Sequence, residues 1–166
     1  PAYLALHRSG ELARRVKAAA GLLDRCELCP RCCRVNRTTG EEGCCRTGSQ
    51  AAVSSYAPHF GEESVLVGSG GSGTIFFSGC NLGCVFCQNW EISRAEEGVT
   101  VSDGQLAAVM VSLQKQGCHN INLVTPSQVV PQILAAVAIA AERGLVLPLV
   151  YNSGGYDRVD TLRLLD

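Results

Sequence analysis

The chain has 166 residues, of which 46% are hydrophobic and 17% are charged, and its formal net charge is −1. This composition excludes an intrinsically disordered chain and gives no general case for a nucleic-acid partner. The longest uninterrupted apolar run, residues 133–141, is too short to cross a bilayer. No charged stretch followed by an apolar one opens the chain, so we expect no secretion signal and a cytoplasmic protein without a membrane partner.

Ten cysteines are the unusual feature of the composition. They are too few for a disulfide scaffold, and clustered cysteines in a reducing compartment indicate metal ligands. Charge is also uneven, because residues 1–50 carry nine basic and five acidic side chains, for a local net charge of +4. Four arginines of this part alternate with cysteines, namely Arg31, Arg34, Arg37 and Arg46.

The predicted elements begin with an amphipathic helix over residues 11–23. Residues 26–48, the cysteine-rich segment, show no hydrophobic period and cannot bury an apolar face, so something other than packing must order them. A possible short strand covers 51–56, and the glycine run 68–73 is a turn because it lacks the Lys-Ser/Thr of a phosphate-binding loop. A strand follows at 74–78.

From residue 102 the pattern alternates between helices and strands. A capping box of Ser102 and Gln105 opens a helix that Gly117 ends, and a strand follows at 120–124. The next helix opens at Thr125-Pro126 and runs to residue 144, although Pro131 favours a start a few residues later. A strand at 147–151 and a helix at 159–165 complete the chain.

Alternating strands and helices predict an α/β fold with a parallel sheet. A complete (β/α)8 barrel needs about 250 residues, and the chain starts at Pro1 and stops where a fourth such strand should follow. We therefore expect a truncated chain that holds the first half of a barrel. The expected domains are an N-terminal helix and cysteine-rich segment at 1–50, a connector at 51–73 and the half-barrel at 74–166.

Three cysteines with the spacing C-x3-C-x2-C follow the strand at 74–78: Cys80, Cys84 and Cys87. Parallel α/β folds place their chemistry at the carboxyl ends of the strands, where this loop begins. Structural zinc sites and most four-iron clusters take four protein ligands. Three thiolates on a [4Fe–4S] cluster would leave one metal position open.

This motif resembles that of the radical S-adenosylmethionine superfamily. The resemblance implies that the three cysteines hold a [4Fe–4S] cluster whose open iron chelates S-adenosylmethionine, and that Phe86 lies beside the adenine. The reduced cluster would cleave the cofactor to a 5′-deoxyadenosyl radical that abstracts hydrogen. Four segments resemble more closely the uncharacterised iron–sulfur proteins grouped with pyruvate formate-lyase activating enzymes: residues 26–37, 71–80, 120–127 and 150–156.

One departure from the activating enzymes concerns the cofactor site. Where they carry Gly-Gly-Glu, which receives the amino group of the cofactor, this chain has Thr125-Pro126-Ser127. The resemblance implies cofactor contacts from this segment, through Thr125 and Ser127, and from Asn152, Ser153 and Gly154. The amino group must therefore be recognised differently here.

The cysteine-rich segment offers a second metal site, either a structural zinc or an auxiliary iron–sulfur cluster. Two ligand registers are open: Cys26, Cys29, Cys33 and Cys45, or Cys26, Cys29, Cys32 and Cys44. The resembled family favours the first. The interleaved arginines would offset the negative charge of four thiolates.

The predicted function is that of a radical S-adenosylmethionine enzyme. The resemblance implies an electron donor such as a flavodoxin or ferredoxin, and a glycyl-radical enzyme as a protein substrate. A non-catalytic iron–sulfur or zinc module for electron transfer or binding is the alternative, and it would need a fourth protein ligand on the cluster. Fold alone does not identify the substrate.

Overall fold

A five-stranded mixed sheet forms the centre of the computed structural model, which describes residues 1–94 and 97–166. The strands are β1 (Ala51–His59), β2 (Ser72–Phe77), β3 (Val99–Val101), β4 (Asn120–Val124) and β5 (Leu149–Asn152). Their order across the sheet is β3-β1-β2-β4-β5. Strands β2, β4 and β5 are parallel, whereas β1 is antiparallel to both of its neighbours, β2 and β3.

The parallel sheet expected from the sequence is therefore confirmed for these three strands, and β1, where the sequence indicated a possible short strand, adds an antiparallel neighbour. Only residues 60–71 join β1 to β2, and they include just the one-turn helix α3 (Ser64–Val67). A parallel pair needs a crossover that carries the chain back along the sheet, so a direct reversal of this kind makes an antiparallel pair. Strand β1 lies in the part of the sequence assigned to a connector.

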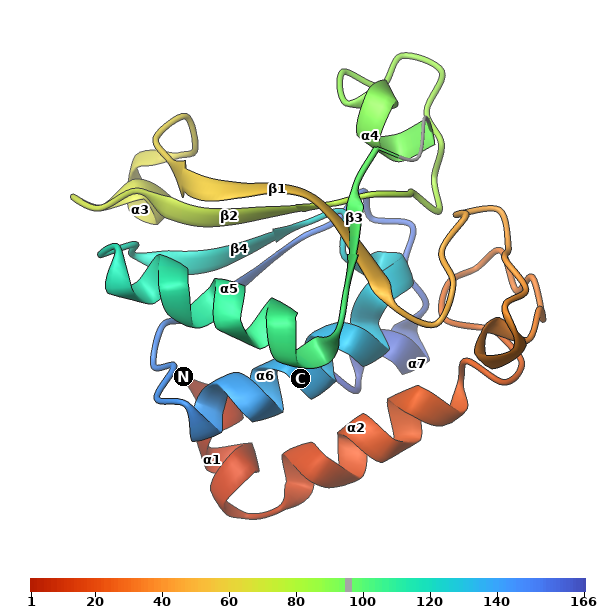
Figure 1. Cartoon of the computed structure of the whole chain (residues 1–166), viewed down its shortest axis with the longest axis horizontal. Coiled ribbons are helices and arrows are strands. Elements are labelled where there is room, and N and C mark those ends of the chain that lie inside the picture. The colour runs from red at the N-terminus through yellow and green to blue at the C-terminus, as the bar shows by residue number, and fades with distance from the viewer. Residues whose placement is uncertain (95–96) are drawn as a thin grey trace.

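Helices α5 (Asp103–Lys115) and α6 (Val130–Glu142) lie against one face of the sheet, and α1 (Ala2–Arg8) and α2 (Glu11–Gly21) pack on the far side of α6 (Figure 1). The predicted capping box opens α5, because the Ser102 and Gln105 side chains each bond the backbone of the other residue. Helix α6 begins late, as Pro131 indicated, since proline fits only the first turn of a helix. Two short helices, α4 (Trp90–Arg94) and α7 (Val159–Leu162), lie outside this layer.

The hydrophobic core lies between this face of the sheet and the helices. Alternate strand residues point into it, so that Ile75 of β2 and both Ile121 and Leu123 of β4 are almost fully buried. Leu113 of α5 and Ile133 of α6 pack against them. These apolar contacts hold the sheet against the helices.

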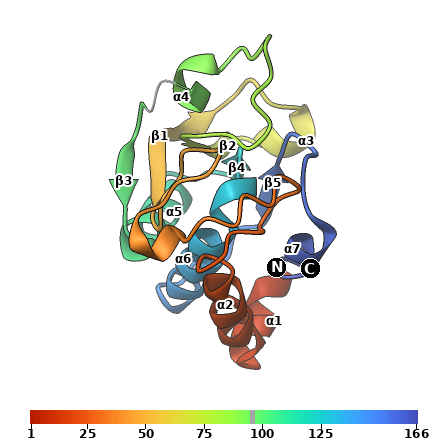
Figure 2. The ribbon, with the colours of Figure 1, turned by 90° about the vertical axis from the view of Figure 1, so that its right-hand side faces the viewer.

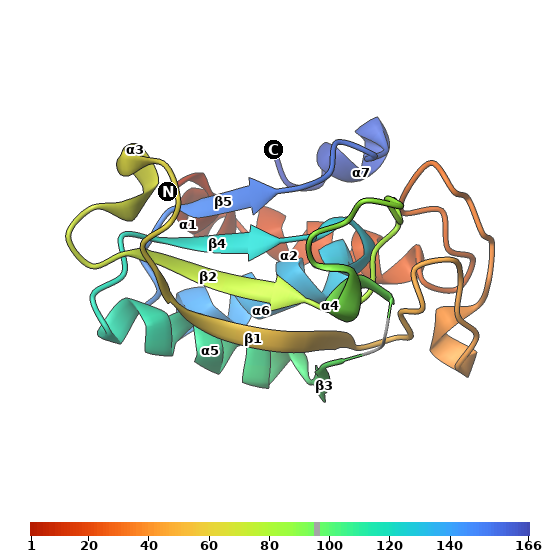
Figure 3. The ribbon, with the colours of Figure 1, turned by 90° about the horizontal axis from the view of Figure 1, so that it is seen from above.

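The opposite face of the sheet is polar. Ser72 donates a hydrogen bond to the side chain of Asn120, 2.7 Å away, and Asn120 donates to the Leu66 carbonyl. Asn122 donates to Glu62 at 3.0 Å. Residues 60–71 thus cover one end of this face, and Figure 3 shows the strands from that side.

Strands β2, β4 and β5 all point toward the end of the molecule where the cysteine-rich segment lies (Figure 3). Figure 2 looks onto this end, with the cysteine-rich segment and the loop before α4 together in front of the sheet. Both groups of cysteines therefore lie at the carboxyl ends of the parallel strands. Within the described residues, no helix has the length and apolar character needed to cross a membrane.

Candidate metal centres

The cysteine loop, which we define as residues 78–89, joins β2 to α4 and carries three half-buried thiols: Cys80, Cys84 and Cys87. The backbone N–H of Leu82 points at the Cys80 sulfur, 3.4 Å away, and the Ser93 hydroxyl donates to the Cys87 sulfur at 3.7 Å. Donors of this kind stabilise a thiolate, which is the form that binds metal. The thiols of this loop therefore fit the donor set of an iron–sulfur cluster.

Glycine allows the loop to lie against the cysteine-rich segment. Gly79 has a φ of +78°, and a Cβ atom at this position would lie 2.4 Å from the Cys45 carbonyl oxygen. Any larger residue would force the two segments apart. The start of the cysteine loop is thus in direct contact with the second group of cysteines.

The residues with predicted cofactor contacts gather at the same edge of the sheet, apart from Phe86. Thr125 directly follows β4, and Asn152 is the last residue of the neighbouring strand β5. The Thr125 N–H donates a hydrogen bond to the Asn152 carbonyl at 3.0 Å. Ser127 is buried in the short turn that follows β4. Figure 3 shows the ends of β4 and β5 side by side, which is where these residues lie.

The remaining three residues of that set lie on loops. Ser153 donates a 2.6 Å hydrogen bond to Asp157, which fixes the turn after β5. Gly154 lies against the Leu82 side chain of the cysteine loop. Phe86 is 86% exposed on the cysteine loop and contributes nothing to the core. An exposed aromatic side chain on this loop is available to a ligand.

Thr125 has a left-handed backbone, with a φ of +60°. A β-branched residue rarely adopts this conformation, and such strain concentrates at functional sites. The Thr125 carbonyl accepts a hydrogen bond from the Gln128 side chain at 2.8 Å. Thr125 is therefore held in a conformation that would suit glycine.

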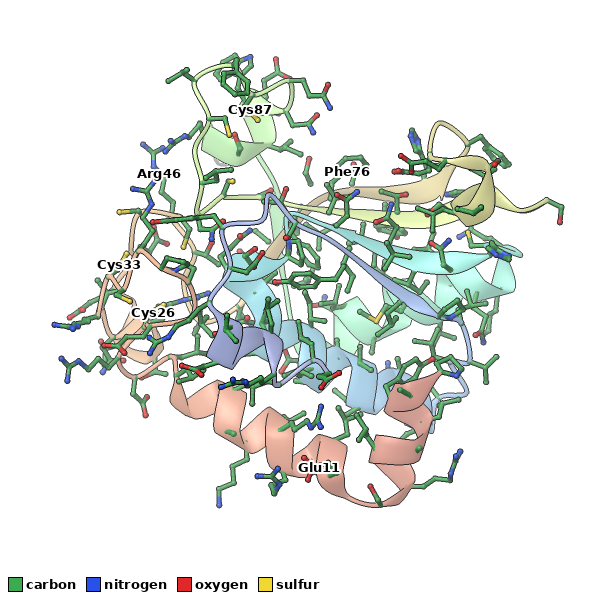
Figure 4. The ribbon with its side chains drawn as sticks, turned by 180° about the vertical axis from the view of Figure 1, so that it is seen from behind. Glu11, Cys26, Cys33, Arg46, Phe76 and Cys87 are labelled. Carbon is green, nitrogen blue, oxygen red and sulfur yellow. The ribbon has the colours of Figure 1, made fainter. Side chains whose placement is uncertain are left out.

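The second group of cysteines surrounds a small cavity in the cysteine-rich segment. Three of these thiols, Cys26, Cys29 and Cys45, are buried. Cys32 and Cys33 also line the cavity. Cys44 instead is exposed and lines a different pocket together with Cys80. Figure 4 shows Cys26 and Cys33 on this segment, Cys87 on the cysteine loop, and Arg46 between them.

No three His, Cys, Asp or Glu side chains in residues 1–94 and 97–166 lie close enough together to hold a metal ion. Burial raises the pKa of the Cys29 and Cys45 thiols above the usual value, although hydrogen bonds from neighbouring groups oppose this shift. The neutral thiol is favoured in such a site until a metal displaces its proton. Both ligand sets stay predictions from the sequence.

Arginines contact both the thiols and the cysteine loop. Arg37 is fully buried, with its guanidinium 3.9 Å from the Cys26 sulfur. Arg158 lies 3.8 Å from the Cys32 sulfur and pairs with Glu27. Arg31 bonds the backbone of the cysteine loop instead. Arg37 thus lies beside a thiol, as expected of an arginine that offsets thiolate charge, whereas the Arg31 side chain binds carbonyl groups of the cysteine loop.

Sequence reasoning missed Gln128, which the pattern placed only in the first turn of a helix. It is buried, and its side chain donates to the Gly79 carbonyl at 2.9 Å as well as to Thr125. Arg94 was also missed, although it donates to the Gly83 carbonyl at 3.0 Å. Nothing in the local sequence signals the bonds to Gly79 and Gly83, because both of these residues lie on the cysteine loop.

Comparison with known proteins places one family on this part of the chain. Residues 66–141 match a 4Fe-4S single cluster domain. The uncharacterized protein MJ0674 of Methanocaldococcus jannaschii is 34% identical over 157 residues, which cover 91% of this chain and 45% of that protein. The chain thus spans less than half the length of this relative, and no solved structure matches it. The family match supports a 4Fe–4S cluster domain, which is consistent with an iron–sulfur protein.

Proposed function

We propose that the chain is part of a radical S-adenosylmethionine enzyme whose [4Fe–4S] cluster is held by Cys80, Cys84 and Cys87. One observation carries the proposal: the matched cluster domain contains only these three cysteines and Cys118. Cys118 lies buried just before β4, at the opposite end of the sheet from the cysteine loop. A cluster held by this domain alone would have three thiolates from one loop and one open iron.

When bound, such a cluster supplies the electron that breaks the C5′–S bond of S-adenosylmethionine, giving methionine and a 5′-deoxyadenosyl radical that takes a hydrogen atom from the substrate. The residues of the chain bind and orient the cofactor. Thr125 and Ser127 at the end of β4, and residues 152–154 after β5, are proposed to contact it. Phe86 is proposed to lie on its adenine.

The polar face of the sheet suits the inside of a partial barrel. Its side chains, including Thr74 and Asn122, are almost fully buried although they do not face the helices. A further set of strands that closed around this face would enclose a polar chamber beside the cysteine loop. We therefore propose a partial-barrel fold for the protein. We also propose a flavodoxin or ferredoxin as the electron donor, a glycyl-radical enzyme as the substrate, and the cytoplasm as the compartment in which the protein works.

The proposal is tested by anaerobic reconstitution of the whole protein with iron and sulfide, followed by reduction with dithionite in the presence of S-adenosylmethionine. We expect 5′-deoxyadenosine and methionine to form in equal amounts, as measured by mass spectrometry. Cys84→Ala should abolish both products. Cys118→Ala removes a thiol far from the cluster and should retain them.

If the Cys84→Ala protein cleaved S-adenosylmethionine as well as the wild type does, the assignment of Cys84 as a cluster ligand would be wrong. Absence of cleavage by a fully loaded wild-type protein would favour the electron carrier instead. An electron carrier needs a fourth protein ligand and should ignore S-adenosylmethionine.

We propose a second site, a structural zinc held by Cys26, Cys29, Cys33 and Cys45. Support comes from the cavity in the cysteine-rich segment, which these four residues line while Cys44 does not. Zinc takes four such thiolates in tetrahedral sites.

Metal analysis after purification tests this second site. We expect about one zinc per chain in the wild type, and loss of that zinc in Cys45→Ala. The neighbouring Cys44→Ala protein is the matched control and should keep its zinc. Loss in Cys44→Ala with retention in Cys45→Ala would assign the other register.

A further inference from the structure

Side chains from outside the cysteine loop hold the first half of its backbone. Four of its carbonyl groups accept such hydrogen bonds: those of Gly79, Asn81, Leu82 and Gly83. The donors are Gln128, Arg31 and Arg94. Because irregular loops have few backbone hydrogen bonds of their own, these contacts decide where the loop lies.

Arg31 makes two of these four bonds, and it comes from the cysteine-rich segment. Its Nε donates to the Asn81 carbonyl and its Nη2 to the Leu82 carbonyl, each at 2.9 Å. The two nitrogens form the planar fork of the guanidinium, which a lysine cannot reproduce. Arg31 therefore fixes two successive peptide groups directly after Cys80.

A second partner, Tyr156 in the loop between β5 and α7, supports this contact. The Arg31 guanidinium lies over the Tyr156 ring, 5.8 Å from its centre. The Asn81 side chain donates to the Tyr156 carbonyl at 2.7 Å. Tyr156 thus contacts both Arg31 and the loop residue whose carbonyl Arg31 binds.

A second, independent route joins the same two segments. Arg37, beside the Cys26 sulfur, donates to the Gln128 carbonyl at 2.8 Å, and the Gln128 side chain donates to the Gly79 carbonyl. The Cys45 carbonyl lies directly against Gly79. The cysteine-rich segment therefore contacts the loop on both sides of Cys80.

We infer that Arg31 is a positioning residue through which the cysteine-rich segment orders the cysteine loop. Arg31 lies between Cys29 and Cys33 in the chain, so a metal bound by these thiols fixes its backbone on both sides. Its side chain then fixes the backbone around Cys80. Binding of metal by the first group of cysteines thereby prepares the second group to receive the cluster, and this consequence rests on the proposed function.

The competing explanation is charge alone, in which Arg31 merely offsets the negative charge of the thiolates. Lysine keeps that charge but can donate only from a single nitrogen atom. Arg31→Lys therefore separates the two explanations. Arg25→Ala is the matched control, because Arg25 belongs to the same part of the chain and is 68% exposed, with Glu27 4.0 Å away.

The test is amide hydrogen exchange on the whole protein, purified with its zinc but without cluster, S-adenosylmethionine or reductant. We expect exchange in residues 80–87 to be about tenfold faster in Arg31→Ala, because two charge-assisted hydrogen bonds are lost. Arg31→Lys should behave like Arg31→Ala, and Arg25→Ala like the wild type. Peptides from α5 serve as an internal reference and should not change, which excludes general unfolding.

A Cys29→Ser variant tests the metal step with Arg31 still present. It should lose zinc and show the same faster exchange in residues 80–87. Unchanged exchange in Arg31→Ala, or wild-type exchange in Arg31→Lys, overturns the inference. This measurement does not depend on cleavage of S-adenosylmethionine. If exchange changes as expected but the protein cleaves no cofactor, the role of Arg31 is retained and the proposed enzyme is rejected. If the protein cleaves the cofactor but exchange does not change, only the role of Arg31 is rejected.

Discussion

Arg37 is a buried cation whose partners are a thiol and carbonyl oxygens. Its Nε and Nη2 atoms both donate to the Gly48 carbonyl, at 2.8 and 2.6 Å, and its Nη1 donates to the Gln128 carbonyl. In the part of the chain that the structure describes, no carboxylate pairs with this guanidinium. A buried charge of this kind is costly unless a negative group faces it. The Cys26 sulfur, as a metal-bound thiolate, would supply that group.

Replacement of Arg37 by methionine tests its structural contribution. The substitution removes the donor of one buried and one partly buried carbonyl group, so we expect the free energy of unfolding to fall by about 3 kcal/mol. Urea denaturation measures the change. Lys17→Ala on the exposed side of α2 is the control and should stay within about 0.5 kcal/mol. A similar small change in Arg37→Met would mean that these hydrogen bonds contribute little.

The residue scale also shows what the sequence could not predict. The alternation of arginine and cysteine suggested charge compensation, and Arg37 beside Cys26 agrees with it. The bonds from Arg31 to Asn81 and from Gln128 to Gly79 join residues about fifty positions apart. Such contacts depend on the fold as a whole, since no local pattern of spacing or hydrophobicity encodes them.

At the scale of elements, α2 is tied to the end of the chain through a carboxylate. Glu11 accepts hydrogen bonds from Arg14 at 2.7 Å and from Arg15 at 2.9 Å. Arg15 also donates to the carbonyl groups of Leu164 and Asp166. The bonds from Arg14 and then Arg15 lower the pKa of Glu11 to about 2. The charged carboxylate therefore helps to hold Arg15 in place.

This pKa predicts how stability responds to acid. Since the folded pKa is lower than the unfolded value of 4.5, the contribution of Glu11 is complete above about pH 4.5 and is lost as the pH falls toward 2. The melting temperature of the wild type should therefore fall more steeply in this range than that of Glu11→Gln. Glu142→Gln, at the exposed end of α6, should keep the wild-type slope. Equal slopes for Glu11→Gln and the wild type would contradict the prediction.

Elements with a strong local signal were predicted well. The capping box at Ser102, the strand at 120–124 and the delayed start of the helix at Pro131 all follow from short-range chemistry. Strand β3 was missed because it has only three residues, none of them buried. The direction of β1 could not be predicted, because the sequence indicates a strand but not its partner.

At the scale of the whole molecule, both groups of cysteines meet at one end of a sheet that is apolar on one face and polar on the other. The sequence predicted that edge for the cysteine loop, because loops after parallel strands gather there. It did not predict that the cysteine-rich segment would lie against the same loop. This contact brings together two cysteine motifs that are separate in the chain.

The most direct test is electron paramagnetic resonance of the whole protein, reconstituted without oxygen and reduced. Spectra are recorded with and without S-adenosylmethionine, and iron and sulfide analysis establishes that the cluster is fully loaded. We predict that the cofactor changes the cluster signal, because three cysteines leave one iron open to it. An unchanged signal from a loaded cluster would mean that every iron already has its full set of protein ligands, which would contradict the proposed radical enzyme.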